Sequence, residues 1–134
     1  AMEYVIHSHG IDTEQSYPYE ATDDTCTFNK SNIGANISSV IRLPKNNMTT
    51  LYNALAFIGP ISVALDAEGD FQMYSSGIFT STECSPDELD HAVLAIGYSI
   101  SHEGHKYLII KNNFFWSNYI TDRAIRSWYF CFVI

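Results

Sequence analysis

The fold of this chain is decided by the segment Leu89-Asp90-His91-Ala92-Val93-Leu94-Ala95-Ile96-Gly97-Tyr98 together with Lys106-Tyr107-Leu108-Ile109-Ile110-Lys111-Asn112. A polar turn of Ser, His, Glu and Gly separates the two apolar runs, and this pattern predicts two adjacent strands joined by a loop. His91 begins the first strand and Asn112 ends the second, so antiparallel pairing would place them side by side. The amide oxygen of Asn112 would then accept one imidazole N–H, and the other ring nitrogen would serve a nucleophile. This is the orienting half of a nucleophile–His–Asn site.

The spacing alone does not decide whether His91 is catalytic, because a histidine beside a strand is more often structural. The wider sequence resembles the papain-like cysteine peptidases, and the cathepsin L group in particular. The resemblance rests on the segment just quoted and on upstream stretches in the same order and spacing: Gly10–Glu14, Ser16–Ala21, Gly59–Ala67 and Ser76–Phe79. It runs from residue 1 to about residue 112.

The order of elements, helix first and then mostly strands, is typical of an α+β fold. Apolar spacing predicts two helices, at Met2–His9 and Met48–Ile58. It also predicts two further strands, at Ile37–Leu43 and Ile61–Ala67. Asn46 or Asn47 would cap the second helix. By resemblance, residues 36–134 correspond to the barrel-like right-hand domain of the papain-like fold. Residues 1–35 correspond to a remnant of the left lobe and the loop that crosses from it.

Length, charge and hydropathy restrict the class of protein. With 134 residues and a hydrophobic fraction of 46%, the chain is long and apolar enough to form a core. The formal charge of −8 argues against nucleic acid and anionic membrane surfaces as partners, because both attract Lys and Arg. No apolar run reaches about 18 residues, so we expect no membrane-spanning segment. The five histidines lack the spacing of metal ligands, and we expect no metal and no other cofactor.

The resemblance implies roles for particular residues. His91 would act as the acid and base of a thioester mechanism, and Asn112 would orient its ring. Ala64 and Leu89 match positions that line the pocket for the second substrate residue before the scissile bond. Asp90 matches a position whose backbone carbonyl can hold the substrate. Ordinary core packing is the alternative role for Ala64.

The nucleophile of such a site is not among these residues. The family's nucleophile motif, a Cys followed by Trp, and its oxyanion-donating Gln do not occur in this sequence. The resemblance therefore implies the C-terminal part of a cysteine endopeptidase, inactive by itself. Its partner would be the missing N-terminal half, or another protein that covers the exposed face. With that half restored, the substrate would be a peptide.

Beyond Asn112 the sequence departs from the family pattern. The family has Ser-Trp-Gly after Lys-Asn, whereas this chain reads Asn113-Phe114-Phe115-Trp116, and no glycine follows Gly104. Phe114 takes the position of the Trp that shields the Asn–His hydrogen bond, and we place it with the substrate-contacting residues. The departure favours an alternative function, that of a non-catalytic papain-like structural or interaction module in a larger assembly.

The three cysteines are an odd number, which indicates a pairing partner elsewhere. By resemblance, Cys84 and Cys131 form a disulfide, while Cys26 matches a cysteine whose partner precedes Ala1 and is unpaired here. The alternative is three free buried thiols in a reducing compartment. The sequence also contains sequons for N-linked glycosylation, at Asn29, Asn36 and Asn47. The resemblance implies a lysosomal or extracellular location.

Overall fold

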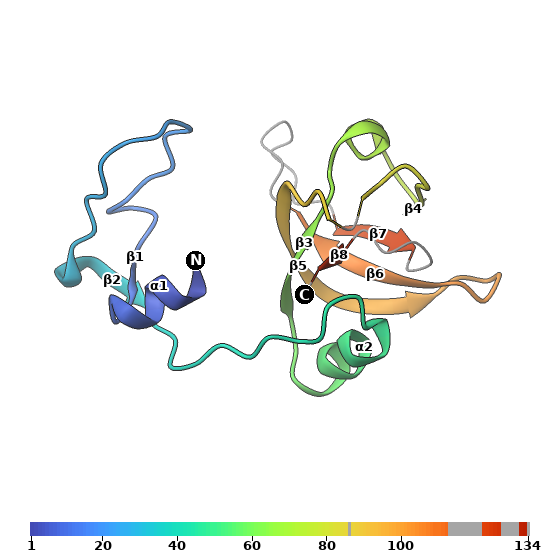
Figure 1. Cartoon of the computed structure of the whole chain (residues 1–134), viewed down its shortest axis with the longest axis horizontal. Helices are drawn as coiled ribbons and strands as arrows, with labels where there is room; N and C mark the ends of the chain where they lie inside the picture. The colour runs from blue at the N-terminus through green and yellow to red at the C-terminus, as the bar shows by residue number, and fades with distance from the viewer. Residues whose placement is uncertain (86, 113–121, 127–131, 134) are drawn as a thin grey trace. The chain divides into compact units, whose positions relative to one another are not determined.

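The structure, a computed structural model, describes residues 1–85, 87–112, 122–126 and 132–133, and the side chains within the first two of these ranges. The chain divides into two compact units, Ala1–Arg42 and Leu43–Ile134 (Figure 1). This division falls later than the boundary expected after residue 35. Both helices and strands are present, which confirms the predicted α+β class. Within the described ranges, no helix has the length and apolarity needed to cross a lipid bilayer.

The first unit contains one short helix and a two-stranded antiparallel sheet. Its elements are α1 (Met2–His7), β1 (Ile11–Asp12), the 3-10 turn η1 (Lys30–Asn32) and β2 (Ile33–Ala35). α1 ends before Gly10, the residue expected to stop it. A Cβ at Gly10 would lie 2.5 Å from Ile33 Cγ2, so this close approach requires glycine.

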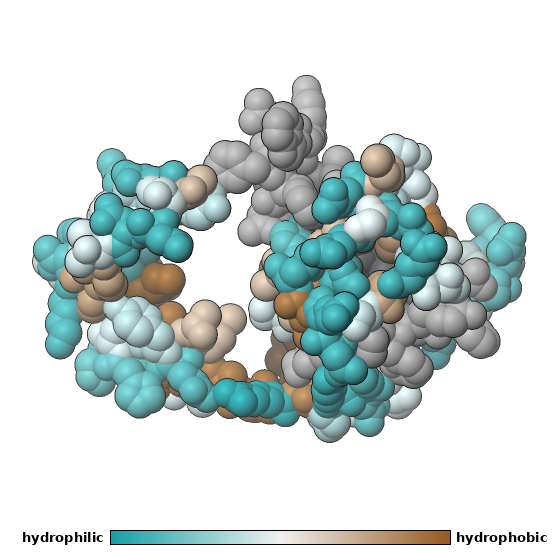
Figure 2. Space-filling model, turned by 45° about the horizontal axis from the view of Figure 1, so that its top comes forward, coloured by the Kyte–Doolittle hydropathy of each residue, from teal (hydrophilic) through white to brown (hydrophobic). Residues whose placement is uncertain are grey.

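The first unit buries little apolar surface. Val5 is the only buried hydrophobic side chain in residues 1–42, all of which the structure describes. Other hydrophobic residues of this unit lie at its surface among hydrophilic ones (Figure 2). The unit therefore lacks the hydrophobic core that an independent domain needs.

The strand predicted over Ile37–Leu43 is wrong. Residues 36–43 form neither helix nor strand, and no described strand pairs with them. Ile41 keeps 81% of its surface exposed. The apolar alternation of this segment is typical of one face of a strand, but a strand also needs a neighbour for its backbone N–H and C=O groups.

The second unit is a six-stranded sheet with one helix packed on it (Figure 1). Its elements are α2 (Met48–Phe57), β3 (Ile61–Leu65), the 3-10 turn η2 (Gly69–Met73), β4 (Ile78–Phe79), β5 (His91–Ile100), β6 (Lys106–Lys111), β7 (Asp122–Arg126) and β8 (Phe132–Val133). β5 and β6 pair antiparallel, as predicted, and β3 pairs antiparallel with the other edge of β5. Asn47 Oδ1 accepts the N–H of Thr50 at 3.0 Å, which confirms one of the two predicted caps of α2.

The core of the second unit lies between α2 and the central strands. Its largest fully buried side chains come from the helix and from β3 and β6: Leu51, Leu65, Leu108 and Ile110. On β5, Val93 and Ala95 are buried while Leu94 between them is only half-buried. This alternation fixes the register of the strand, because a one-residue slip would turn its apolar side chains away from the core.

The hydrogen-bonded sheet does not close into a barrel. The strand order is β4-β7-β6-β5-β3-β8, and within the described residues the end strands β4 and β8 do not pair with each other. Each of these end strands is only two residues long. The expectation of a barrel-like domain is corrected in this respect: strands this short offer too few backbone groups to complete the ladder.

Candidate active site

His91 and Asn112 lie at the same end of the β5–β6 pair. Leu94 pairs with Lys111, so the first residue of β5 and the residue after β6 end up close together. His91 Nε2 lies 2.8 Å from Asn112 Oδ1, which confirms the contact expected from the strand arrangement. Asn112 is 8% exposed and His91 is half-buried. Because a carboxamide oxygen can only accept, this contact requires the proton on Nε2.

A β-bulge lies between the turn and the site. Ala95 pairs with Ile110 and Gly97 pairs with Ile109, which leaves Ile96 as an extra residue on β5. One extra residue shifts the register and turns the following side chains to the opposite face. The bulge therefore sets how the His91 end of β5 faces β6.

Asp90 fixes the chain immediately before His91. Its backbone N–H donates to the carbonyl of Leu65 at 3.3 Å, and its Oδ1 accepts the N–H of Ala67 at 2.7 Å. His91 itself is the register partner of Leu65. The carboxylate of Asp90 thus holds the backbone that follows β3, and the substrate contact expected of its carbonyl stays a prediction.

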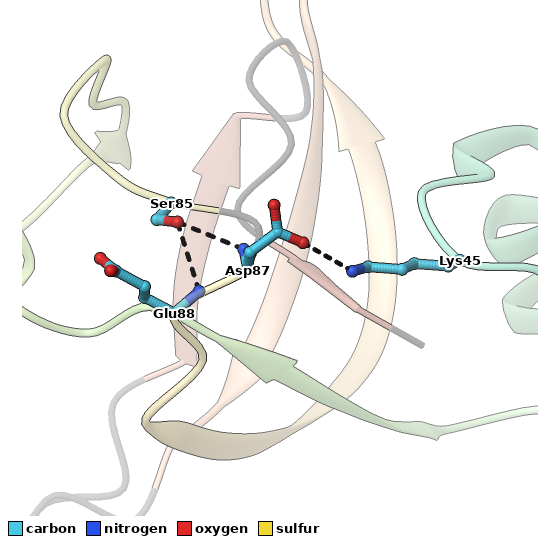
Figure 3. Close-up of polar contacts among 4 residues, drawn as sticks. All are labelled: Lys45, Ser85, Asp87 and Glu88. Carbon is cyan, nitrogen blue, oxygen red and sulfur yellow. Dashed lines mark hydrogen bonds and ion pairs between the residues drawn. The ribbon is translucent and has the colours of Figure 1, made fainter.

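The loop before β5 is held by several further polar contacts. Ser85 Oγ accepts the backbone N–H groups of Asp87 and Glu88, each at 3.2 Å (Figure 3). Lys45 Nζ donates to Asp87 Oδ1 at 2.8 Å across this loop (Figure 3). Asp66 Oδ2 accepts the backbone N–H of Ser85 at 2.8 Å. These contacts hold the loop that leads into His91. Lys45 fixes it from the segment before α2, and Asp66 fixes it from the end of β3.

Asp66 also supports the site, and it was not among the residues expected to do so from the sequence. Asp66 follows β3 directly, and its Oδ1 also accepts the N–H of Glu68 at 3.0 Å. One feature of the sequence could have indicated this role: Asp66 stands at the end of a predicted strand, before a turn that contains glycine. At such a position the carboxylate often accepts a hydrogen bond from the backbone N–H two residues later.

The expected substrate-contacting residues Ala64 and Leu89 lie near the same end of the sheet. Ala64 is half-buried on β3 and pairs with Ala92, next to His91. Leu89 is half-buried and precedes Asp90. Two other expected residues lie outside the described part of the chain, Phe114 and Cys131.

The cysteines are placed in different parts of the chain. Cys84 is half-buried in the loop before β5, and its pairing with Cys131 stays a prediction. Cys26 is exposed in the first unit, with a free thiol. The backbone N–H of Phe28 and then the hydroxyl of Tyr4, which lies 3.7 Å from Sγ, lower the pKa of the Cys26 thiol. The same contact raises the pKa of Tyr4.

A cavity of about 220 Å³ adjoins the loop before β5. Five of its lining residues carry carboxylates: Asp66, Glu68, Asp70, Glu83 and Glu88. Even so, the described residues contain no group of three or more His, Cys, Asp or Glu side chains arranged to hold a metal ion. What the site offers chemically is proton transfer through an imidazole whose ring is oriented by an amide.

Comparison with known proteins extends these observations. The model of the papain family of cysteine proteases matches residues 1–123. A cathepsin L-like peptidase of Aedes aegypti is 46% identical over 114 residues, covering 84% of this chain and 34% of that protein. Cathepsin L of Sarcophaga peregrina is 43% identical over the same length, again covering 84% of this chain and 34% of that protein. The chain thus spans about a third of the length of these relatives.

Solved structures agree with the sequence comparisons. Digestive procathepsin L 3 of the Tenebrio molitor larval midgut has a TM-score of 0.82 at 34% identity, over 93% of this chain and 41% of that one. Bromelain from Ananas comosus, solved in complex with the E64 inhibitor, has a TM-score of 0.75 at 34% identity, over 97% of this chain and 62% of that one.

Proposed function

The chain belongs to the papain family of cysteine proteases, and from this we propose that it is the C-terminal portion of a papain-like cysteine endopeptidase. The observation that carries the proposal is the 2.8 Å contact between His91 Nε2 and Asn112 Oδ1. The nucleophilic cysteine and the oxyanion-stabilising glutamine would come from a segment outside this chain. The chain by itself would therefore not hydrolyse peptides.

The two ring nitrogens of His91 would have distinct tasks, and the contact of Nε2 with Asn112 supports this division. Asn112 Oδ1 holds the proton on Nε2, so Nδ1 is the nitrogen that would take the proton of the cysteine thiol. The thiolate would attack the peptide carbonyl, and Nδ1–H would then protonate the leaving amine. The resulting thioester would be hydrolysed by a water molecule that His91 deprotonates. Asn112 would keep the ring in position through both steps.

The proposed substrate class is supported by the character of Ala64 and Leu89. Ala64 and Leu89 are uncharged, half-buried, and near the end of the sheet that carries His91. A pocket lined by small or apolar residues favours an apolar substrate side chain, because burying an unpaired charge there would cost free energy. We therefore expect a bulky apolar residue at the second position before the scissile bond.

The required partner is a polypeptide that covers the apolar surface of the first unit. The exposed fractions there are 45% for Met2, 51% for Tyr4 and 50% for Ile11, while Val5 is the one buried hydrophobic side chain among the described residues 1–42. The 114 matched residues make up only 34% of these relatives, so a further segment that could cover this surface exists in them. The partner would be the N-terminal half of the same peptidase, and made alone the chain would associate or aggregate.

Location and cross-linking follow from the same proposal. A cysteine endopeptidase of this kind would be lysosomal or extracellular, where disulfides persist. The bond between Cys84 and Cys131 would then tie the loop before β5 to the end of the chain. This would add a covalent restraint to the polar contacts of Ser85 and Asp66 that already hold the loop.

Complementation tests the proposal. The chain would be refolded with the N-terminal segment of the Aedes aegypti cathepsin L-like peptidase, and cleavage of a fluorogenic peptide with Leu two positions before the bond would be measured. We expect cleavage that His91→Ala abolishes. Asn112→Ala should lower it roughly tenfold, because the orienting hydrogen bond is worth about 1–1.5 kcal/mol.

The matched control is the same N-terminal segment refolded with its own C-terminal part. If this chain forms a complex of the same size as the control but cleaves nothing, it is not the C-terminal portion of an active endopeptidase. That result would favour the alternative, a non-catalytic structural or interaction module. The observation behind this alternative is the sequence after Asn112, which has no glycine where the family has several.

A further inference from the structure

We propose that Lys45 is a positioning residue for substrate selection, because its ion pair with Asp87 holds the loop that carries Leu89. The proposal rests on the proposed function in one respect, namely that Leu89 lines the pocket for the second substrate residue before the scissile bond. Lys45 itself is neither one of the two catalytic residues nor one of the expected substrate contacts. Its role would be to keep a wall of the pocket in place.

Leu89 lies in a loop whose two ends are both tied to the region of β3. Before Leu89, the Ser85 N–H donates to the Asp66 carboxylate, and the Ser85 hydroxyl accepts the N–H of Glu88. After it, the Asp90 N–H donates to β3, and the Asp90 carboxylate holds the turn that follows β3. Within the described residues, Leu89 makes no hydrogen bond of its own. Its position therefore depends on what else holds the loop between these ends.

Lys45 reaches the loop from a packed part of the second unit. It occupies a turn in which the Asn47 N–H donates to the Pro44 carbonyl at 3.3 Å, and Asn47 is the N-cap of α2. The helix in turn packs into the core through Leu51 and Leu55. The ion pair therefore links the loop to a helix that is itself fixed by the core.

The charge of the loop makes this cation important. Residues 81–90 contain four carboxylates and no Lys or Arg. Among the salt bridges of the described residues, the pair of Lys45 with Asp87 is the one that reaches any of these carboxylates. The Glu88 carboxylate lies on the side of Asp87 away from Lys45 (Figure 3). Since like charges within one short loop repel, removing Lys45 would break an attraction and leave this repulsion without compensation.

The exposure of the ion pair sets the size of the expected effect. The side chains of Lys45 and Asp87 are 52% and 78% exposed, so water screens their attraction. Exposed pairs of this kind change a conformational equilibrium by about 1.5- to fivefold. Such a change is too small to unfold the second unit. It is enough to alter how often Leu89 occupies its place in the pocket, and an enzyme selects between apolar substrate side chains by contacts of this kind.

The first measurement follows the loop itself and needs no peptidase activity. Amide hydrogen exchange is read by nuclear magnetic resonance at Glu88 and Asp90, the hydrogen-bonded N–H groups on either side of Leu89, in the complex refolded with the N-terminal segment. Lys45→Met should make both amides exchange about two- to fivefold faster, because the loop opens more often. Lys45→Asp should do the same, and adding Asp87→Lys to it should restore slow exchange by re-forming the pair with reversed charges.

The second measurement is the selectivity of the same complex. It compares kcat/KM for two fluorogenic peptides that carry Leu or Ala two positions before the bond. In Lys45→Met the ratio of the two values should fall about two- to fivefold, mainly through a higher KM for the Leu peptide. At about 1 M salt the parent should approach the variant, because salt screens an exposed ion pair. A merely structural role would lower both values equally and leave their ratio unchanged.

Arg42→Met is the matched control, since it breaks another exposed ion pair, with Glu3, and should change neither measurement. Equal exchange in the parent and Lys45→Met would overturn the proposal. So would faster exchange with an unchanged selectivity ratio in an active complex. A complex that forms but cleaves nothing would count against the proposed function alone, because hydrogen exchange would still show whether Lys45 holds the loop around Leu89.

Discussion

Asp66 and Ser85 are joined by a hydrogen bond in which the carboxylate oxygen Oδ2 accepts the Ser85 backbone N–H at 2.8 Å. The contact ties the residue after β3 to the loop that leads into His91. The second oxygen of Asp66 accepts the N–H of Glu68 at 3.0 Å, so one half-buried carboxylate satisfies two backbone donors.

We expect Asp66→Ala to lower the free energy of unfolding by about 1–3 kcal/mol, because two backbone N–H groups lose their acceptor. Urea denaturation gives the energy, and amide hydrogen exchange at Ser85 locates the effect. Glu88→Ala is the control, since it removes an exposed carboxylate from the same loop and should change the stability by less than about 0.5 kcal/mol. Equal effects of the two substitutions would mean that the Asp66 contacts do not stabilise the loop.

The residues around the site show which structural features can be predicted from the sequence. The β5–β6 pair and its His91–Asn112 contact were predictable, because apolar alternation and a polar turn are local signals. The Asn47 cap was predictable for the same reason. The supporting contacts of Asp66 and Asp90 were not, because their partners are backbone N–H groups, which every residue offers.

Two expectations about strands were wrong, because strand pairing depends on segments that lie far apart in the sequence. The alternation at Ile37–Leu43 describes one face of a possible strand but carries no information about a neighbouring strand. The sheet likewise does not close, because closure depends on the length and placement of β4 and β8, which lie far apart in the sequence. The bulge at Ile96 likewise cannot be predicted from the sequence of β5 alone. It is defined by the pairing of β5 with β6.

The helix cap at Asn47 gives a second prediction. Asn47→Ala should destabilise the second unit by about 1 kcal/mol, because the N–H of Thr50 loses its side-chain acceptor. Asn47→Asp, which keeps an acceptor oxygen at the cap, should stay within about 0.5 kcal/mol of the parent chain. Chemical denaturation followed by circular dichroism would measure both, and a larger loss for the aspartate variant would refute the assigned role.

A third prediction concerns the reactivity of Cys26. Hydrogen bonds from the Phe28 backbone and from the Tyr4 hydroxyl lower the pKa of this thiol, because they favour the thiolate. Tyr4→Phe removes one of these donors, so the pKa should rise and less thiolate should be present near neutral pH. We expect slower alkylation by iodoacetamide in the folded variant, with the midpoint of the pH–rate curve moved to higher pH. In denaturant the two proteins should react at the same rate, and identical curves in the folded state would contradict the contact.

The pairing of Cys84 with Cys131 is a fourth prediction. Such a disulfide closes a loop of 46 intervening residues and would stabilise the fold by roughly 4 kcal/mol in the chain-entropy model. Mass spectrometry of the unreduced, digested chain from an oxidising compartment should detect the linked peptides. Replacing both cysteines with serine should lower the midpoint of thermal unfolding. Free thiols at both positions in such material would remove the argument for a secretory location.

The last prediction tests the orientation of the His91 ring directly. Because Asn112 Oδ1 can only accept, its 2.8 Å contact with Nε2 selects the tautomer that carries the proton there. A net hydrogen bond of about 1 kcal/mol favours this tautomer roughly fivefold. Asn112→Ala should therefore raise the fraction of neutral His91 with its proton on Nδ1, where that proton would block transfer from a thiol. Nitrogen-15 chemical shifts of the imidazole report this fraction whether or not a nucleophile is present. His105, which lies in the turn between β5 and β6, provides an internal reference whose shifts should stay unchanged. If the His91 shifts were the same in the parent and the variant, the asparagine would not orient the ring, and the assignment of Asn112 to the site would fall.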